Sequence, residues 1–360
     1  MGTKATAVVS LLLSLARERL PEMQSRELAN TLWAVSKLDV DEPAFVGALV
    51  SEARPKLSNF NDQELSNTAY ALAKPGHEDK AFISELLDTA PTKLSSFNKQ
   101  NLANILWATA EMGHRDKDFV SLLLVAAKLK LANFKPHELS NTAWALATLG
   151  HNDTAFMGAL LVAATPRLAS FGAQNMSNTV WAQATLGYYD ASFMEALLGE
   201  AKLKLANFKP QELTNTAWAL ATLGHKDKAF MGALLVAAKP KLSSFTAQAL
   251  ANMVWALATL DYYDAAITGA LLAAAGSKLP SFTAQNLSNT AWAMATLGHR
   301  DAAFMNALLV AAGTKLSGFT LANANQMSFA LTKFNIKDAE FEHAVKDTPR
   351  PARRLPCGGK

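Results

Sequence analysis

Cysteine and charge are both scarce in this sequence. The 360 residues include one cysteine, Cys357, and charged side chains make up 18% of the chain. A single cysteine excludes a disulfide framework and any zinc or iron–sulfur site built on cysteines. No apolar run is long enough to cross a bilayer, because Lys, Asp or Gly interrupts each within about 18 residues. We therefore expect no membrane partner, and the 50% of hydrophobic residues suffices for a folded core.

The elements of a catalytic site are also missing. No strand is predicted, no glycine-rich phosphate loop is present, and no Ser, His and Asp residues form a cluster that stands apart from the general pattern. Cys357 lies in a tail of Pro, Gly and Arg, a poor setting for a nucleophile. We expect no enzyme, no cofactor, no metal ion and no small-molecule substrate.

Net charge gives little indication of a partner. The 34 basic and 30 acidic residues give a formal charge of +4, but residues 347–360 contribute four basic side chains against one acidic side chain. The rest of the chain is therefore close to +1. A strong attraction to nucleic acid does not follow from charge alone.

The sequence does contain a repeat of 37 residues that never slips. An Asn-x-x-Trp pair marks the repeat, and these pairs include all seven tryptophans. Another copy, Asn67 and Tyr70, keeps the spacing, and a worn ninth copy has Gln326 and Phe329 in phase. The copies with tryptophan are Asn30/Trp33, Asn104/Trp107, Asn141/Trp144, Asn178/Trp181, Asn215/Trp218, Asn252/Trp255 and Asn289/Trp292.

Each copy is predicted to form two helices joined by short turns. In the fourth copy, Pro136 suits a first helical turn, apolar residues at 3–4 spacing follow, and Gly150 ends the helix. Asp153 is typical of an N-cap, and the second helix is expected to end near Arg167. One hairpin cannot bury its apolar face alone, whereas stacked copies can. The predicted fold is all-α, a right-handed α-solenoid of stacked helix-turn-helix repeats.

The period also divides the chain. Residues 5–22 align with the second helix of a preceding copy, so we expect a half repeat that caps the array. Eight repeats cover residues 23–319, and a degenerate repeat at 320–345 is expected to cap the other end. Residues 346–360 are predicted to be a disordered basic tail.

The stretch Asn-Thr-Ala-Trp-Ala-Leu-Ala-Thr-Leu-Gly, from Asn141 to Gly150, resembles the signature of the octotricopeptide repeats and the related heptatricopeptide repeats. The resemblance covers residues 5–345. It implies a helical-pair solenoid that binds single-stranded RNA, commonly in chloroplasts or mitochondria, in transcript stability, processing or translation. Many members end in a RAP domain, and none is expected here. Armadillo repeats also pair Trp with Asn, but their three-helix unit is too long for this period.

Two positions of the first helix are candidates for reading bases. On a helical wheel, Glu138 and Asn141 share an arc with Ala145, opposite an apolar arc. The first position lies three residues before the asparagine and is a carboxylate or an amide in most copies. The second position directly precedes it and is usually a glutamine. Such groups can bond one base edge per repeat. A capping role for the same position is the alternative. The predicted base-reading residues are Glu64, Asn101, Glu138, Asn175, Glu212, Asn286, Gln100, Gln174, Gln211 and Gln285.

The asparagines form a ladder of their own. They are candidates for anchoring the RNA backbone or ribose, with small neighbours that would let a ligand approach. The alternative is that each amide is buried and bonds to the next repeat. The ladder positions proposed to contact RNA are Asn67, Asn104, Asn141, Asn178, Asn215, Asn252 and Asn289.

A basic residue recurs at the end of every second helix. If helix pairs stack at about 8–10 Å, these cations form a stripe that a phosphate backbone can follow. The alternative is that they complement the helix macrodipole. The residues assigned to the RNA backbone are Lys93, Lys130, Arg167, Lys204, Lys241 and Lys278, with Arg19, Lys56 and Lys315 in phase.

Two further groups are assigned structural roles. The tryptophans border the apolar arc and are predicted to fill the gap between helices rather than to stack on bases. The histidines of one loop position precede an acid by two residues, and the acid is interpreted as a helix cap rather than as part of a metal site. Those histidines are His77, His114, His151, His225 and His299.

These patterns predict a non-catalytic protein that binds single-stranded RNA, with other proteins of an RNA-processing complex as further partners. A protein- or peptide-binding scaffold of the same shape is the alternative, and a purely structural array is the third hypothesis. A mitochondrial or chloroplast location rests on the resemblance alone.

Overall fold

The computed structural model describes residues 3–38, 42–73 and 79–337. Within these ranges the chain is α-helical with short 3-10 turns and has no strands, which confirms the predicted all-α solenoid. None of the helices in the described ranges has the length and apolar character that crossing a membrane requires. The predicted tail at 346–360, the end of the ninth copy and His77 lie outside the described residues. The chain divides into two compact units, residues 1–197 and 198–360, and each is described by itself.

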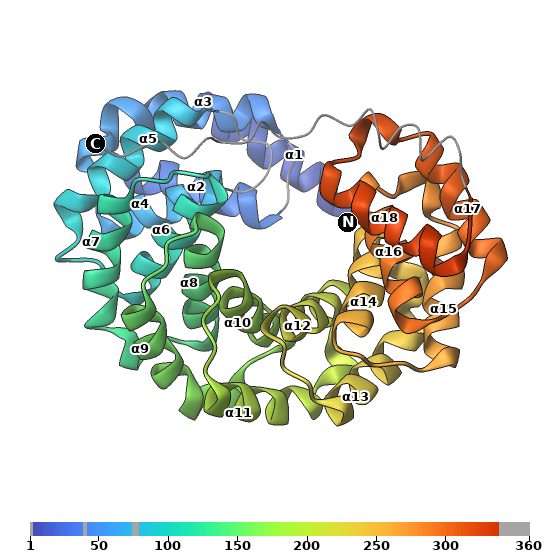
Figure 1. Cartoon of the computed structure of the whole chain (residues 1–360). Helices are drawn as coiled ribbons and strands as arrows, with labels where there is room; N and C mark the ends of the chain where they lie inside the picture. Colours follow the sequence, from blue (N-terminus) through green and yellow to red (C-terminus); the bar gives the residue numbers. More distant parts are fainter. Residues whose placement is uncertain (1–2, 39–41, 74–78, 338–360) are drawn as a thin grey trace, which may run out of the picture. The chain divides into compact units, whose positions relative to one another are not determined.

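Two kinds of helix alternate along the chain (Figure 1). The first helix of each repeat, here called the A helix, carries the asparagine and the aromatic residue. The A helices are α2 (Ser25–Leu38), α4 (Asp62–Leu72), α6 (Lys99–Glu111), α8 (Pro136–Leu149), α10 (Ala173–Leu186), α12 (Pro210–Leu223), α14 (Ala247–Thr259), α16 (Ala284–Leu297) and α18 (Leu321–Phe334).

The second helix of each repeat, here called the B helix, is followed by a 3-10 turn that leads to the next A helix. The first B helix and its turn η1 (Leu20–Glu22) come before the first A helix. The B helices are α1 (Thr3–Glu18), α3 (Pro43–Ala53), α5 (Lys80–Thr89), α7 (Lys117–Lys128), α9 (Thr154–Ala164), α11 (Ala191–Lys202), α13 (Lys228–Ala238), α15 (Ala265–Gly276) and α17 (Ala302–Gly313).

The local signals in the sequence locate the helix ends well. Gly150 ends α8 in the left-handed region at φ 65°, where a glycine meets no Cβ penalty. The carboxylate of Asp153 accepts a hydrogen bond from the Phe156 N–H at 2.9 Å and caps α9. The predicted end of this helix is three residues too late, because Arg167 belongs to the 3-10 turn η5 (Thr165–Ser170). A proline at the second residue of this turn is the signal for the change.

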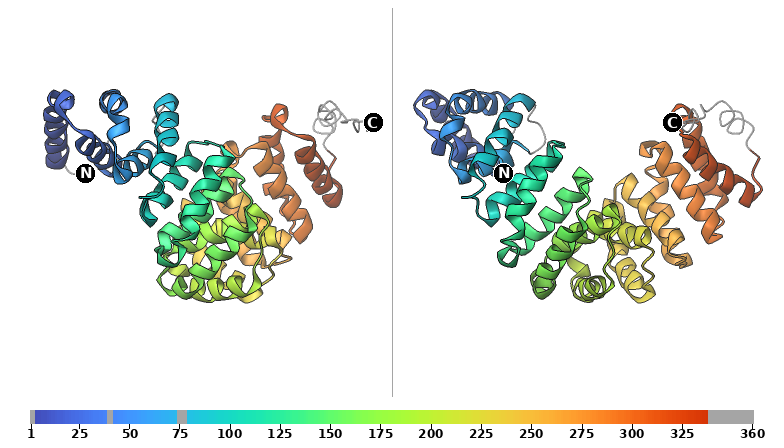
Figure 2. Two further views of the ribbon diagram at one scale, coloured as in Figure 1. Left: turned by 90° about the vertical axis from the view of Figure 1, so that its left-hand side faces the viewer. Right: turned by 60° about the vertical axis from the view of Figure 1, so that its left-hand side comes forward.

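Consecutive A helices pack side by side within each unit, α2 to α10 in the first and α12 to α18 in the second. Most B helices pack against the A helix of their own repeat, as α7 does against α6 and α15 against α14, and the further views in Figure 2 show the same sequence order. An inner A helix is therefore enclosed on three sides, by two A helices and one B helix. One narrow face of each A helix stays open.

Phenylalanine fills the core between the helices. The phenylalanine just before each inner A helix is at most 1% exposed, from Phe60 to Phe282. Small side chains of the A helices are buried too, and Ala145 is 0% exposed, so the expectation that Ala145 leaves room for a ligand is wrong. The helical wheel failed here because it contains no information on the neighbouring A helices.

Candidate nucleic-acid interface

The residue three before each ladder asparagine caps its own helix. Its side chain accepts a hydrogen bond from the N–H of the N-cap residue. Glu138 is 2% exposed, and its Oε2 lies 2.6 Å from the backbone nitrogen of Lys135. The capping alternative is confirmed at six predicted base-reading positions, where one oxygen of each side chain is engaged by its own helix. They are Glu64, Asn101, Glu138, Asn175, Glu212 and Asn286.

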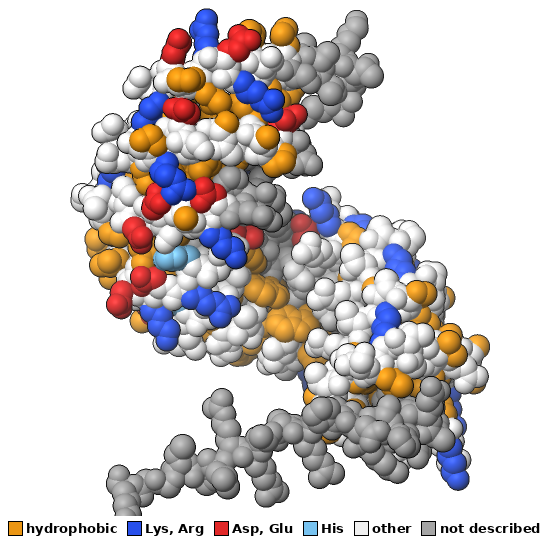
Figure 3. Space-filling view, turned by 90° about the horizontal axis from the view of Figure 1, so that it is seen from above, with side chains coloured by type: hydrophobic (Ala, Val, Ile, Leu, Met, Phe, Trp, Pro, Cys, Tyr) orange, Lys and Arg blue, Asp and Glu red, His pale blue; other side chains and the backbone are white. Residues whose placement is uncertain are grey.

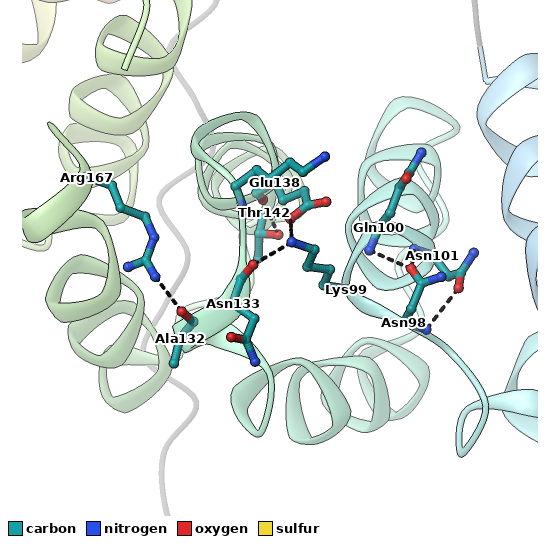
Figure 4. Close-up of polar contacts among 10 residues, drawn as sticks. Asn98, Lys99, Gln100, Asn101, Ala132, Asn133, Glu138, Thr142 and Arg167 are labelled. Atoms are coloured by element: carbon teal, nitrogen blue, oxygen red, sulfur yellow. Dashed lines mark hydrogen bonds and ion pairs between the residues drawn. The ribbon is translucent and has the colours of Figure 1, made fainter. Parts of the chain in front are cut away.

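Asparagine at this capping position also connects adjacent repeats. The Nδ2 of Asn101 donates to Ser66 Oγ of the preceding A helix at 2.8 Å, and Asn175 Nδ2 donates to Ser140 Oγ at 3.0 Å. A glutamate has no donor for such a contact. Glu138 faces Lys99 Nζ of the preceding repeat instead, at 3.9 Å (Figure 4). Part of the alternation between Glu and Asn therefore follows from helix stacking.

The cationic ladder is bonded to the protein itself. Lys241 Nζ donates to the carbonyls of Ala206 and Phe208 at 2.7 and 2.5 Å, and Lys130 donates to the Phe97 carbonyl. The Arg167 guanidinium bonds the Ala132 carbonyl in the same way (Figure 4). Each cation satisfies carbonyls of the turn 33–35 residues earlier, and the same holds for Lys56, Lys278 and Lys315. These cations connect adjacent repeats. Neither the predicted contact with phosphates nor the predicted effect on the helix macrodipole described this role.

Two other members of the cationic ladder complete this picture. Lys204 also has an interaction partner. Lys93 is partly buried in a shallow depression that it shares with Arg54, Glu85 and Asp88. Acidic and basic groups are mixed there, so this depression is not a cationic track for phosphates.

The asparagine ladder, by contrast, is open. All seven ladder asparagines predicted to contact RNA are partly exposed. In the part of the chain that the structure describes, their side-chain amides form no hydrogen bond with the protein. An amide has two donors and two acceptor lone pairs, so each repeat offers a full set of hydrogen bonds to a ligand. The alternative of a buried, inter-repeat asparagine therefore does not hold.

Two more side chains lie on the same open face. The residue four before the asparagine is exposed, and the aromatic residue three after it is partly exposed. Spacings of four and three residues place all of them along one side of a helix. We call this set the open stripe, exemplified by Gln211, Asn215 and Trp218 on α12. The predicted glutamines Gln100, Gln174, Gln211 and Gln285 all lie on it.

The aromatic residues of the open stripe are partly exposed. None of the seven tryptophans is buried, and Trp33 is 41% exposed, so these residues are not part of the buried core, although rings such as Trp144 and Trp181 do lie between neighbouring A helices as predicted. Neighbouring rings approach each other across the A helices: Tyr70 and Trp107 have centroids 4.6 Å apart, and Trp144 and Trp181 lie 6.5 Å apart at 28°. Partly exposed rings of this kind are platforms on which nucleobases stack. The Asn-x-x-Trp spacing itself was the signal for this shared face.

The open stripe carries little charge. Its glutamines, asparagines and aromatic residues are neutral. One cation lies next to it, because the ammonium of Lys37 is 4.5 Å from the ring centroid of Tyr70. On the face shown in Figure 3, cationic and anionic side chains are mixed, and neither sign gathers into one continuous patch. Contacts along the stripe therefore rely on hydrogen bonds and stacking more than on ion pairs.

A groove interrupts the open stripe of the second unit between α12 and α14. Its volume is about 470 Å³ and it lies on the N-terminal halves of both helices. Amide side chains of the stripe line both walls, together with Lys209 at the rim. The lining residues are Lys209, Pro210, Gln211, Thr214, Asn215, Ser244, Thr246, Gln248, Ala249 and Asn252. Sequence reasoning missed this groove, although Ala249 breaks the Glu/Asn alternation.

Within the described residues, no group of three or more His, Cys, Asp and Glu side chains is placed to hold a metal ion. The acid that follows the loop histidines caps the B helix, as Asp116 does for α7. His114 itself packs edge-on against Phe119 at 5.9 Å.

The repeat architecture and the open stripe define a helical-repeat binding protein. The chain belongs to the RNA-editing substrate-binding complex 6 protein family, whose model matches residues 19–265. No curated protein matches the chain. Among solved structures, a homology model of the full-length AP-3 complex in an intermediate open conformation matches 95% of this chain and 80% of that chain, at 10% identity and a TM-score of 0.30.

Proposed function

We propose that this chain is a non-catalytic RNA-binding component of an RNA-editing substrate-binding complex, and that its open stripe contacts unpaired bases. The observation that carries the proposal is the ladder of partly exposed asparagines, whose amides have no partner among the described residues. An aromatic ring accompanies each of these amides, and a glutamine accompanies all but Asn141, where His137 takes its place. Hydrogen bonding together with stacking is the chemistry by which proteins recognise single-stranded RNA.

The family supports this proposal through its name, which refers to the substrate of RNA editing. The resemblance to octotricopeptide repeats points to the same ligand class, and a mitochondrial or chloroplast location belongs to this proposal as well. Other proteins of the complex are proposed as partners. A-form RNA duplexes keep their base edges paired, so the open stripe favours unpaired strands over double helices.

Fluorescence anisotropy with a labelled pool of unpaired RNA tests the proposal. We expect the combined Asn104→Ala, Asn141→Ala and Asn178→Ala variant to bind about tenfold or more weakly, because hydrogen bonds of about 0.5–1.5 kcal/mol are lost at three positions. The thermal midpoint should stay unchanged, since these amides bond nothing in the described protein.

A matched triple variant controls for the loss of surface amides. Asn133→Ala, Asn152→Ala and Asn207→Ala remove three exposed asparagines that lie off the open stripe. Binding by this control should equal that of the unmodified chain. Equal affinities for both triple variants would show that the ladder does not contact RNA.

A peptide-binding scaffold is the second candidate, and the neutral stripe is the observation that favours it. A ladder of free amides can also bond the backbone of an extended peptide. If peptides taken from partner proteins bind, lose affinity in the ladder triple variant and no RNA binds, then this second function is correct.

A further inference from the structure

The groove between α12 and α14 lies where one repeat differs in sequence from the others. At the equivalent junction of α6 and α8, Lys99 and Glu138 occupy the space between the helix starts, 3.9 Å apart (Figure 4). Three repeats later the corresponding residues are Pro210 and Ala249, which are both too short to fill it. Short residues are common at the first of these positions, as Pro136, Ala173 and Ala247 show, so Ala249 is the substitution that sets this junction apart.

Ala249 also lacks the side chain that completes the N-terminal cap in the other repeats. In the other described A helices, an acid or amide at the third position accepts from the N-cap N–H, as Glu212 does from Lys209 at 2.7 Å. Ala249 has no such acceptor. Only the reciprocal half of the cap remains, from the Ala249 N–H to Thr246 Oγ1 at 3.1 Å. A ligand oxygen in the groove would occupy the place that a carboxylate fills elsewhere.

The groups that face this hollow have unused hydrogen-bonding capacity. Four stripe amides line it, two from each helix: Gln211 and Asn215, Gln248 and Asn252. In the described structure none of these amides bonds to the protein, and neither does the ammonium group of Lys209. The cation is single and lies at the rim, whereas the amides line the walls.

We propose that this groove is a subsite for one nucleotide of an unpaired RNA strand, an inference that rests on the proposed function. The amides bond the edge of the base, and Lys209 pairs with the adjoining phosphate. The volume lies within the range of about 300–1,000 Å³ typical of small-ligand sites. A nucleotide combines one anionic phosphate with a neutral base rich in donors and acceptors, which matches one ammonium and four amides.

Filling the groove tests the subsite. Ala249→Glu restores the side chain that Glu138 and Glu212 provide, so the fold should be as stable as before or more so. The same change occupies the hollow with an anionic group. Against labelled RNA homopolymers of each of the four bases, we expect affinity for the preferred homopolymer to fall about fivefold to tenfold, the size of one lost hydrogen bond.

Asn286→Glu is the matched control, because it adds the same carboxylate at the same position one repeat later. Its affinity should stay within about twofold of the unmodified chain. Lys209→Gln supplies a second measurement: it should weaken binding and lower the salt slope by about one counterion. Free uridine or adenosine monophosphate should not displace the polymer at equal nucleotide concentration, since neighbouring stripe contacts are needed.

The outcomes separate the two proposals. If the chain binds RNA and Ala249→Glu and Lys209→Gln both bind as tightly as the unmodified chain, the subsite is overturned and the proposed function stands. Tight binding of the mononucleotide without binding of the polymer also overturns it. If no RNA binds at all, the proposed function fails and the subsite fails with it.

Discussion

Two ladders recur every 37 residues in this protein, and they differ in what they bond. The cations that follow the B helices donate to carbonyls of the preceding repeat, as Lys241 does to Ala206 and Phe208. The side-chain amides of the asparagine ladder on the A helices form no hydrogen bond within the described structure. Strict recurrence is therefore compatible with stacking and with ligand binding alike. What separates the two is whether a partner exists one repeat away.

The largest effect on stability is expected from removing one cation of the cationic ladder. Lys241→Met removes the donor to two backbone carbonyls, and charge-assisted hydrogen bonds contribute about 1.5–3 kcal/mol. We expect the urea midpoint of unfolding to fall, while RNA affinity of the folded protein stays the same. Because repeat arrays need not unfold in one step, the transition should be followed by circular dichroism and by tryptophan fluorescence together.

Lys239→Met is the matched control for this experiment. It removes an exposed ammonium two residues earlier on the same turn, where the described structure shows no bond. An unchanged midpoint in Lys241→Met, together with weaker RNA binding, would contradict the structural role of the cations. The ladder would then follow the phosphate backbone after all.

A third kind of polar residue extends this comparison. Its side chain forms no hydrogen bond and is also buried away from solvent. Gln183 on α10 is 0% exposed, and neither its Oε1 nor its Nε2 has a hydrogen-bond partner. Leucine occupies this position in α8 and α12. We expect Gln183→Leu to stabilise the protein by about 1–2 kcal/mol, since a buried unbonded amide is costly. Urea denaturation measures this gain.

The reciprocal change provides the control. Leu220→Gln places the same amide in the equivalent buried position of α12 and should destabilise by a comparable amount. If Gln183→Leu lowered stability instead, the amide of Gln183 would not be a cost to the native state, and this prediction would be wrong.

The fold was predictable because its signals are local. The 37-residue period, Gly150 as a helix end and Asp153 as an N-cap depend on neighbours within one repeat, and all three are confirmed. The end of α9 was less accurate, since a 3-10 turn and a last α-helical turn share the same apolar spacing. Local patterns thus determine the elements better than their ends.

The candidate site was predictable only in part, because its partners lie in other repeats. The helical wheel placed Asn141 correctly on the polar, open side of the helix. It placed Trp144 with the core and Ala145 on the open face. In the structure the two flanking A helices bury Ala145, and Trp144 stays partly exposed. No pattern within a single repeat indicates that Lys241 bonds a turn 33–35 residues earlier. The groove at Ala249 is lined by residues of two repeats, α12 and α14, which only the packed structure brings together.

A smaller effect is expected at the bond between Asn175 and Ser140, which is 3.0 Å long and connects α10 to α8. A double-mutant cycle with Asn175→Ala and Ser140→Ala should give a coupling of about 0.5–1 kcal/mol in unfolding free energy. Asn286 faces Ala251 in the equivalent place, so Asn286→Ala with Ala251→Ser supplies a pair in which the native bond is absent. A coupling near zero for Asn175 would remove the proposed reason for asparagine at the capping position.

The smallest effect concerns charge on the open stripe. Glu111 lies one turn beyond Trp107, where the next five repeats have threonine, and burial raises the pKa of its carboxyl. The native state therefore keeps this proton to higher pH than the unfolded chain does. Stability falls as pH rises from the ordinary carboxyl pKa through the raised native one. Glu111→Gln removes this loss, so its advantage in urea midpoint should grow across that interval and then level off.

The same substitution tests whether the stripe contacts an anionic ligand. Removing a negative charge one turn beyond Trp107 should raise RNA affinity slightly, and more at low salt than at high salt, because salt screens charges near the surface. Glu195→Gln removes an equal charge from the outer face of α11 and measures the general effect of net charge. If both variants gain affinity equally, the change reports net charge alone; a gain confined to Glu111→Gln places the RNA along the A helices rather than on the B helices.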